Sequence, residues 1–182
     1  TGNLGVTPAG CTPQFYVLVF GGLPVPAEWE SRGISEATVP EELVPMKPPL
    51  LAELKSNNYM LNALLMMKAQ DLGGTFGISV DREGNLRESC VLNVLVVGAD
   101  GVVRTPPFKR ALAGTTVRRA FELLRADSAA AANERHAGVA YEMAQEEIPV
   151  EAARRAREVM LLAGDRHLFS ITKLDGAPIG DG

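Results

Sequence analysis

Residues 53–59 read Glu-Leu-Lys-Ser-Asn-Asn-Tyr, a polar stretch between a proline-rich segment at 44–50 and an apolar run at 60–67. Most lysines lie on protein surfaces, so Lys55 by itself is most simply a surface charge. Two later stretches favour another interpretation. They read Glu-Ser-Cys-Val-Leu-Asn at 88–93 and Leu-Ala-Gly-Thr-Thr-Val-Arg at 112–118. A candidate amine, a candidate acid and a glycine-threonine turn therefore follow one another in order.

This ordered set resembles the class IV (fold-type IV) pyridoxal-phosphate-dependent aminotransferases. That family includes branched-chain aminotransferases, D-amino-acid aminotransferases and aminodeoxychorismate lyase. The resemblance runs from about residue 3 to about residue 176, mainly over the C-terminal large domain of the family. Each motif alone is a weak signal, whereas the three in this order form a fairly specific one.

The composition is that of a globular protein. The chain has 182 residues, of which 46 % are hydrophobic and 22 % charged, with a net charge of −4. This balance, with no basic stripe, argues against nucleic-acid binding. Two cysteines, Cys11 and Cys90, make no disulfide framework, which favours a soluble protein in a reducing compartment such as the cytoplasm, a plastid or a mitochondrion. The longest apolar run is too short to span a membrane and is interrupted by Asn62 and Lys68.

The first residue is Thr1 rather than methionine, so we expect a processed or truncated product. In the resembled family a small N-terminal domain precedes the large one. The resemblance implies that residues 1–47 are the tail of that small domain plus a linker, and that residues 48–182 form the cofactor-binding domain. Most of the small domain would then be missing.

The first half of the chain predicts two strands and one long helix. Residues 14–20 are apolar and rich in β-branched and aromatic side chains, which is typical of a strand, and residues 34–39 form a shorter strand-like patch. Residues 57–71 have the spacing of an amphipathic helix, capped by Ser56 or Asn57 and ended at Gly73-Gly74. The methionines in this region, at positions 60, 66 and 67, fit a gap-filling role in the core.

The second half predicts a β-meander followed by mixed elements. Four short strands with intervening turns disfavour a dinucleotide-binding fold, and no glycine-rich phosphate motif is present. Together these patterns predict an α+β chain with the D-amino-acid-aminotransferase-like fold, in which a meander sheet is flanked by helices. The expected strands are 75–80, 86–90, 92–97, 102–105, 139–145, 158–163 and 168–174, and the expected helices start at Thr115 or Thr116 and at Pro149.

Pyridoxal 5′-phosphate requires an amine, an acid at its pyridine nitrogen, phosphate donors and a surface against its ring. By resemblance, Lys55 is the amine that forms the Schiff base and then moves the substrate proton. We expect the amine to be desolvated between the linker and the helix. The resemblance also places Tyr59 near the phenolic oxygen of the cofactor.

The remaining contacts are also implied by the resemblance. Glu88 pairs with the pyridine nitrogen, Leu112 packs on the ring, and the phosphate is bound by Gly114, Thr115 and Thr116. A second phosphate contact falls at Gly164, where the usual threonine is missing and Asp165 would oppose an anion. Cys90 and Val91 also replace a small polar pair, so the substrate of a relative does not carry over. His136 and His167 fit no metal-ligand pattern, and we expect no metal.

The interpretation that follows is an enzyme that transfers an amino group from a branched-chain or D-amino acid to a 2-oxo acid. By resemblance its partners are these small molecules and a second copy of the chain in a homodimer. Two alternatives stay open: lyase chemistry on the same cofactor, and a truncated fragment that binds cofactor or serves assembly without catalysis. A plain α+β domain without cofactor is the third, least favoured because of the ordered motifs.

Overall fold

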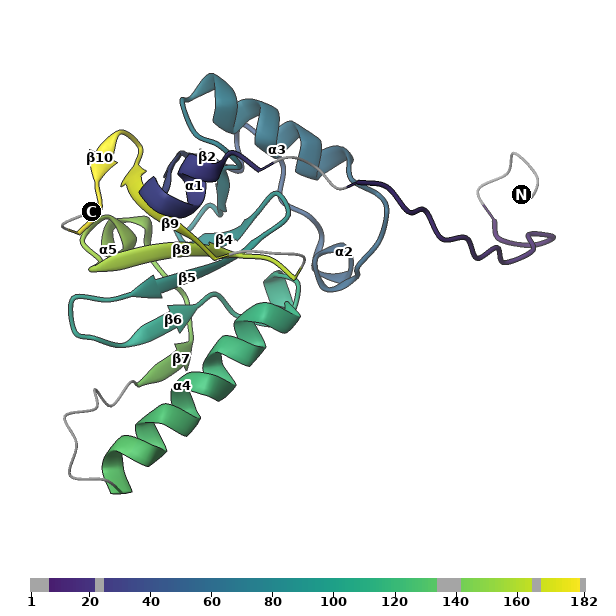
Figure 1. Cartoon of the computed structure of the whole chain (residues 1–182). Helices are drawn as coiled ribbons and strands as arrows, with labels where there is room; N and C mark the ends of the chain where they lie inside the picture. Colours follow the sequence, from purple (N-terminus) through teal and green to yellow (C-terminus); the bar gives the residue numbers. More distant parts are fainter. Residues whose placement is uncertain (1–6, 22–24, 134–141, 165–167, 181–182) are drawn as a thin grey trace.

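The computed structural model of the chain describes residues 7–21, 25–133, 142–164 and 168–180 (Figure 1). The helices are α1 (Ala27–Arg32), α2 (Pro49–Glu53), α3 (Met60–Asp71), η1 (Phe108–Arg110), α4 (Thr115–Asn133) and α5 (Val150–Arg154). The strands are β1 (Ile34–Glu36), β2 (Thr38–Pro40), β3 (Ile78–Val80), β4 (Leu86–Ser89), β5 (Asn93–Val97), β6 (Val103–Thr105), β7 (Met143–Gln145), β8 (Glu158–Leu162), β9 (Leu168–Leu174) and β10 (Ala177–Pro178).

The described strands form two β-sheets. The larger has the order β1-β9-β8-β5-β6-β7, with β10 added to β9, and the smaller has the order β2-β3-β4. The successive hairpins β3–β4 and β5–β6 are antiparallel, as the predicted meander requires. Three pairs are parallel, namely β1 with β9, β2 with β3 and β6 with β7. The predicted α+β class is confirmed.

The core lies on both faces of β5, which is the reason that residues 94–97 of this strand are all apolar. Val94 and Val96 join a cluster that includes Ile78 and Leu86 from the smaller sheet. Leu95 points to the other face, where it belongs to a second cluster with side chains of α4. That helix lies along the sheet in Figure 1, and its Val117 and Phe121 are buried in this second cluster.

Helix α3 packs on the smaller sheet through one side only. Leu65 and Ala69 are buried in a cluster with Val39 and Cys90. The helix ends as predicted, with Gly73 at φ 85°. Its start differs from the prediction, because it begins at Met60 and no side chain caps it.

The prediction that the methionines fill the core was wrong for two of the three. Met60 is 69 % exposed and Met67 is 62 % exposed. Leu65 and Ala69 already occupy the side of α3 that faces the sheet, so the opposite side is left open.

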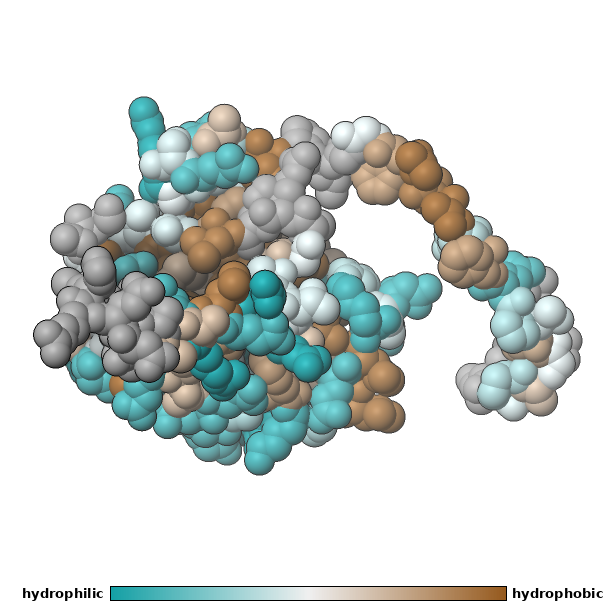
Figure 2. Space-filling view, turned by 60° about the horizontal axis from the view of Figure 1, so that its bottom comes forward, coloured by the Kyte–Doolittle hydropathy of each residue, from teal (hydrophilic) through white to brown (hydrophobic). Residues whose placement is uncertain are grey.

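The prediction of a strand at residues 14–20 was also wrong. This segment has no regular secondary structure, and the exposed fraction of its apolar side chains reaches 92 % at Phe15. Figure 2 shows its apolar side chains clear of the body. A strand requires a hydrogen-bonded neighbour, and the described residues give this segment none.

The segment from 27 to 40 joins the body. Trp29 of α1 lies edge-on to Phe76 and Phe169, with ring centroids 5.4 Å and 5.9 Å away. Strands β1 and β2 pair with β9 and β3, although they precede residue 47. The domain division at residue 47 stays a prediction.

Candidate cofactor site

A cavity of about 220 Å³ lies between the α2–α3 segment and the bend that joins β4 to β5. Four of the predicted site residues line it, although they come from three separate stretches of the chain. They are Lys55, Tyr59, Glu88 and Leu112. The other predicted residues, Gly114, Thr115, Thr116 and Gly164, do not line this cavity.

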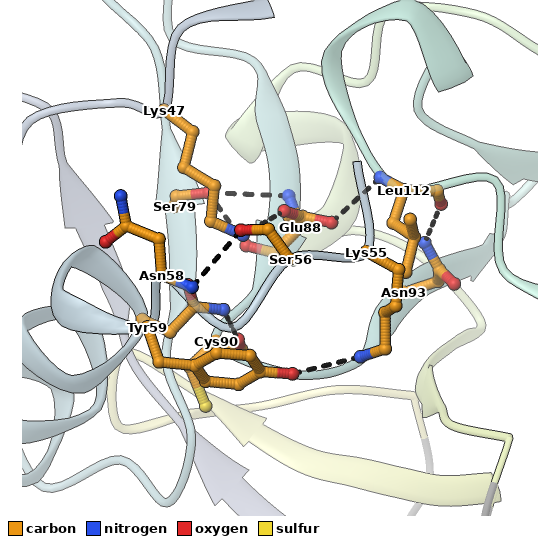
Figure 3. A network of polar contacts seen from close by, with 11 residues as sticks. Lys47, Lys55, Ser56, Asn58, Tyr59, Ser79, Glu88, Cys90, Asn93 and Leu112 are labelled. Carbon is orange, nitrogen blue, oxygen red and sulfur yellow. Dashed lines mark hydrogen bonds and ion pairs between the residues drawn. The ribbon is translucent and has the colours of Figure 1, made fainter. Parts of the chain in front are cut away.

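Lys55 lies between the end of α2 and the start of α3. Its Nζ donates a hydrogen bond to the Tyr59 hydroxyl over 3.0 Å (Figure 3). The same amine lies 5.6 Å from the centre of the tyrosine ring, which adds a cation–π attraction. Lys55 is exposed, so the expectation that burial desolvates its amine was wrong. The tyrosine therefore orients an amine that remains open to solvent.

Glu88, in β4, is held at both carboxylate oxygens. Oε1 pairs with Lys47 Nζ at 2.7 Å, and Oε2 accepts the Leu112 backbone N–H at 3.0 Å (Figure 3). The glutamate side chain is 12 % exposed, so most of its hydration is lost. A carboxylate in such a place requires a cationic or hydrogen-bonding partner, and it has both.

Two asparagines fix the backbone around the cavity. Asn93, the first residue of β5, donates to Leu112 O over 2.7 Å. Asn62 of α3 donates to the carbonyl oxygen of Cys90 in the β4–β5 bend. These bonds hold the apolar wall at Leu112 and the floor of the cavity in place.

Gly114, Thr115, Thr116 and Gly164 form a second group at the N-terminus of α4. A Cβ on Gly164 would lie 3.5 Å from Thr115 Oγ1 and 4.0 Å from Thr116 Oγ1. The first turn of α4 contains no acidic residue, so its backbone amides and dipole favour an anion. The Thr116 hydroxyl donates to Ala163 O over 2.8 Å, which ties this turn to the end of β8. Asp165 lies outside the described residues.

Asn93 connects the two groups. It lines the cavity, and a Cβ on Gly114 would overlap its Oδ1. The glycine is therefore required by the close approach of this side chain. A molecule with a ring in the cavity and an anionic group at α4 would pass along the Leu112–Gly114 turn.

Sequence reasoning missed Lys47. It lies between two prolines in a stretch that looks like a linker, and its partner is 41 residues away. One signal was present: Lys47 is the only cation between residues 33 and 54, among four glutamates. That count indicates a paired lysine but does not identify the partner.

Cys90 in the β4–β5 bend is buried, and burial raises the pKa of its thiol to about 11. It is neutral at physiological pH and acts as apolar wall. Within the described residues, no set of three or more His, Cys, Asp and Glu side chains is placed to hold a metal ion. No helix in the described part of the chain has the length and apolarity to cross a membrane.

The sequence profile of the family described as amino-transferase class IV matches residues 1–174. The chain therefore belongs to the class IV aminotransferases, as its motifs predict. The family uses pyridoxal phosphate, and its members include branched-chain and D-amino-acid transaminases.

Individual relatives support this placement. The chain is 30 % identical to the chloroplastic D-amino-acid transaminase of Arabidopsis thaliana, over 76 % of this chain and 36 % of the relative. It is 26 % identical to the branched-chain amino acid aminotransferase of Escherichia coli, with a TM-score of 0.67 over 86 % of this chain and 47 % of the other. A PLP-bound hypothetical aminotransferase from Mycobacterium tuberculosis has the same fold, with 22 % identity and a TM-score of 0.70 over 86 % and 54 %. The chain thus spans roughly a third to a half of these proteins.

The residues present fit pyridoxal phosphate. The site contains an amine at Lys55, a carboxylate at Glu88 that pairs with a cation, and an apolar wall at Leu112. An anion-binding helix N-terminus lies at the start of α4. Gly164 leaves open the space beside the two threonine hydroxyls, which a side chain there would reduce. These elements meet the four requirements of the cofactor.

Proposed function

We propose that this chain carries the cofactor site of a class IV aminotransferase, which moves an amino group from a branched-chain or D-amino acid to a 2-oxo acid. The observation that carries the proposal is the convergence of Lys55, Tyr59, Glu88 and Leu112 on one cavity. When bound, pyridoxal phosphate supplies the electron sink that stabilises negative charge on the substrate carbon.

Each side chain has a stated role in this proposal. The Lys55 amine would hold the cofactor and, when free, would move the proton at the substrate carbon. Tyr59 orients that amine through the 3.0 Å bond. Glu88 holds a proton on the pyridine nitrogen, and Leu112 excludes water from one side of the ring. Gly114, Thr115, Thr116 and Gly164 bind the phosphate at α4.

The experiment is an absorbance titration of the chain with pyridoxal phosphate, followed by borohydride reduction and peptide mapping. We expect saturable binding and a label at Lys55. Lys55→Ala should lose the label, whereas Lys173→Ala, a matched change of an exposed lysine in β9, should keep it. A label spread over several surface lysines would refute the proposed site.

We further propose that the chain acts as a homodimer. Exposed apolar side chains gather on α2, α3 and their flanks, and such a patch is typical of an association surface. They are Leu50, Leu54, Met60, Leu64 and Met67. Sedimentation equilibrium tests this, and a monomer at micromolar concentration would contradict it.

Two alternatives remain with the same cofactor site. Lyase chemistry would release product from the bound substrate without a 2-oxo acid acceptor. A chain that binds cofactor without turnover is favoured by the length comparison, since this sequence covers 36 % of its Arabidopsis relative. Amino-group transfer by the chain, assayed with branched-chain and D-amino acids, separates these from the main proposal.

A further inference from the structure

Two lysines line the cavity, and each has its own partner. Lys55 is bonded to Tyr59, whereas Lys47, in the segment between β2 and α2, is paired with Glu88 (Figure 3). The Lys47 side chain is 25 % exposed, so its ammonium group has given up part of its hydration for this pair. The proposed function assigns no task to Lys47.

The pair affects what the Glu88 carboxylate can bind. Lys47 Nζ occupies Oε1, and the Leu112 N–H occupies Oε2. The Leu112 donor belongs to the backbone, whose carbonyl is held by Asn93. Lys47 instead reaches Glu88 through a flexible four-carbon side chain. Of the two donors, Lys47 is therefore the one that can move away from the Glu88 carboxylate.

We propose that Lys47 is the cation that occupies Glu88 in the cofactor-free chain, and that it competes with the protonated ring nitrogen of pyridoxal phosphate for this carboxylate. The inference rests on the proposed function, because it takes Glu88 as the partner of the ring. The Lys47 ammonium group and the protonated ring nitrogen both carry a positive charge, so they repel each other when both lie at the Glu88 carboxylate. Lys47 thus stabilises the cofactor-free chain and weakens cofactor binding.

The test compares Lys47→Met with the parent in two measurements. Removing the ammonium group leaves a partly buried carboxylate without its cation, so the cofactor-free variant should unfold at a lower temperature. The same variant should bind pyridoxal phosphate more tightly, with a dissociation constant lower by about tenfold in the absorbance titration. Lys47→Arg keeps the cation and should remain within about threefold of the parent.

A double-mutant cycle assigns the effect to Glu88. In a Glu88→Gln background, Lys47→Met should change the dissociation constant by less than about twofold, because the shared carboxylate is gone. Lys47→Gln removes the charge but keeps a polar side chain, and it replaces Lys47→Met if the methionine variant does not fold. It should give the same dissociation constants as expected for Lys47→Met, with Glu88 and in the Glu88→Gln background.

The outcomes separate this inference from the proposed function. Binding by the parent with unchanged or weaker binding by Lys47→Met and Lys47→Gln overturns only the competition, and leaves Lys47 as a supporting residue. No saturable binding by the parent overturns both. Tighter binding by the two variants, lost in the Glu88→Gln background, establishes the competition.

Discussion

Arg104 shows how a polar side chain orders a turn far from the cavity. It makes two hydrogen bonds of 2.8 Å to the Asp100 carboxylate, across the turn from β5 to β6, and a third bond to Glu146. The bond from Arg104 lowers the pKa of Asp100 to about 2. A bidentate pair of this kind fixes geometry more than it adds stability, because its carboxylate is exposed to water.

Asp100→Asn should therefore change the pH dependence of stability. The folded-state pKa is lowered, so the contribution of the carboxylate is present above about pH 4 and is lost as the pH falls toward about 2. We expect the variant to melt at a lower temperature than the parent near neutral pH, and the difference to shrink as the pH falls toward about 2. Melting curves by circular dichroism measure this. The control is Glu122→Gln, which removes a carboxylate from an exposed pair on α4. A difference of the same size at about pH 7 and at about pH 2 would contradict the prediction.

At the scale of elements, the turn before α4 links the two halves of the candidate site. Leu112 lines the cavity, Gly114 lies against Asn93, and Thr115 begins the helix. The cofactor ring and phosphate would be bound by residues a few positions apart. The geometry of this turn would then set both contacts together.

Gly114→Ala should disrupt that turn. The added methyl group would overlap Asn93 Oδ1, which is held in place by the bond from Asn93 to Leu112 O. We expect a loss of about 1–3 kcal/mol of unfolding free energy, typical of overpacking, measured by urea denaturation.

Two further variants identify the cause. Gly84→Ala places a methyl group in open space at φ 80° and should cost about 1 kcal/mol from backbone strain alone. Asn93→Ala combined with Gly114→Ala should be less destabilising than the sum of the single changes, because the clashing atom is gone. Strict additivity would mean that the overlap is not the cause.

At the scale of the whole molecule, the main feature is the contrast between the two-sheet body and the apolar segment at residues 15–20. Six consecutive apolar side chains there are exposed by 65 % to 92 %. The body in turn packs its aromatic rings closely, as in the 5.8 Å stack of Phe76 on Phe169. The chain therefore contains a packed domain and an extended apolar segment, which has no partner strand among the described residues.

Limited proteolysis should distinguish the two parts. Chymotrypsin should first cut after Phe15, Tyr16 or Phe20, at least about 100-fold faster than after Phe121 or Phe169, which are buried. Mass spectrometry of the early products locates the cuts. Cleavage in the body at a comparable rate, or resistance of residues 15–20, would show that the segment is packed in solution.

The sequence by itself determined the family, the order of the motifs and most of the helices and strands. Periodicity places α3, α4 and β5 because a core face repeats locally along the chain. The motifs at Lys55, Glu88 and Thr115 indicate the cofactor because pyridoxal phosphate takes an amine, a group at its ring nitrogen and phosphate donors from a protein.

Only the tertiary structure decided which groups meet. The pairing of Lys47 with Glu88, the exposure of Lys55 and the unpaired segment at 15–20 depend on contacts between distant parts of the chain. Strand propensity indicates that residues 15–20 can pair but supplies no neighbour. A count of charges indicates that Lys47 needs an acid but does not identify Glu88, which lies outside the counted stretch. Local pattern specifies the conformations that a segment favours, whereas packing selects the partners that it meets.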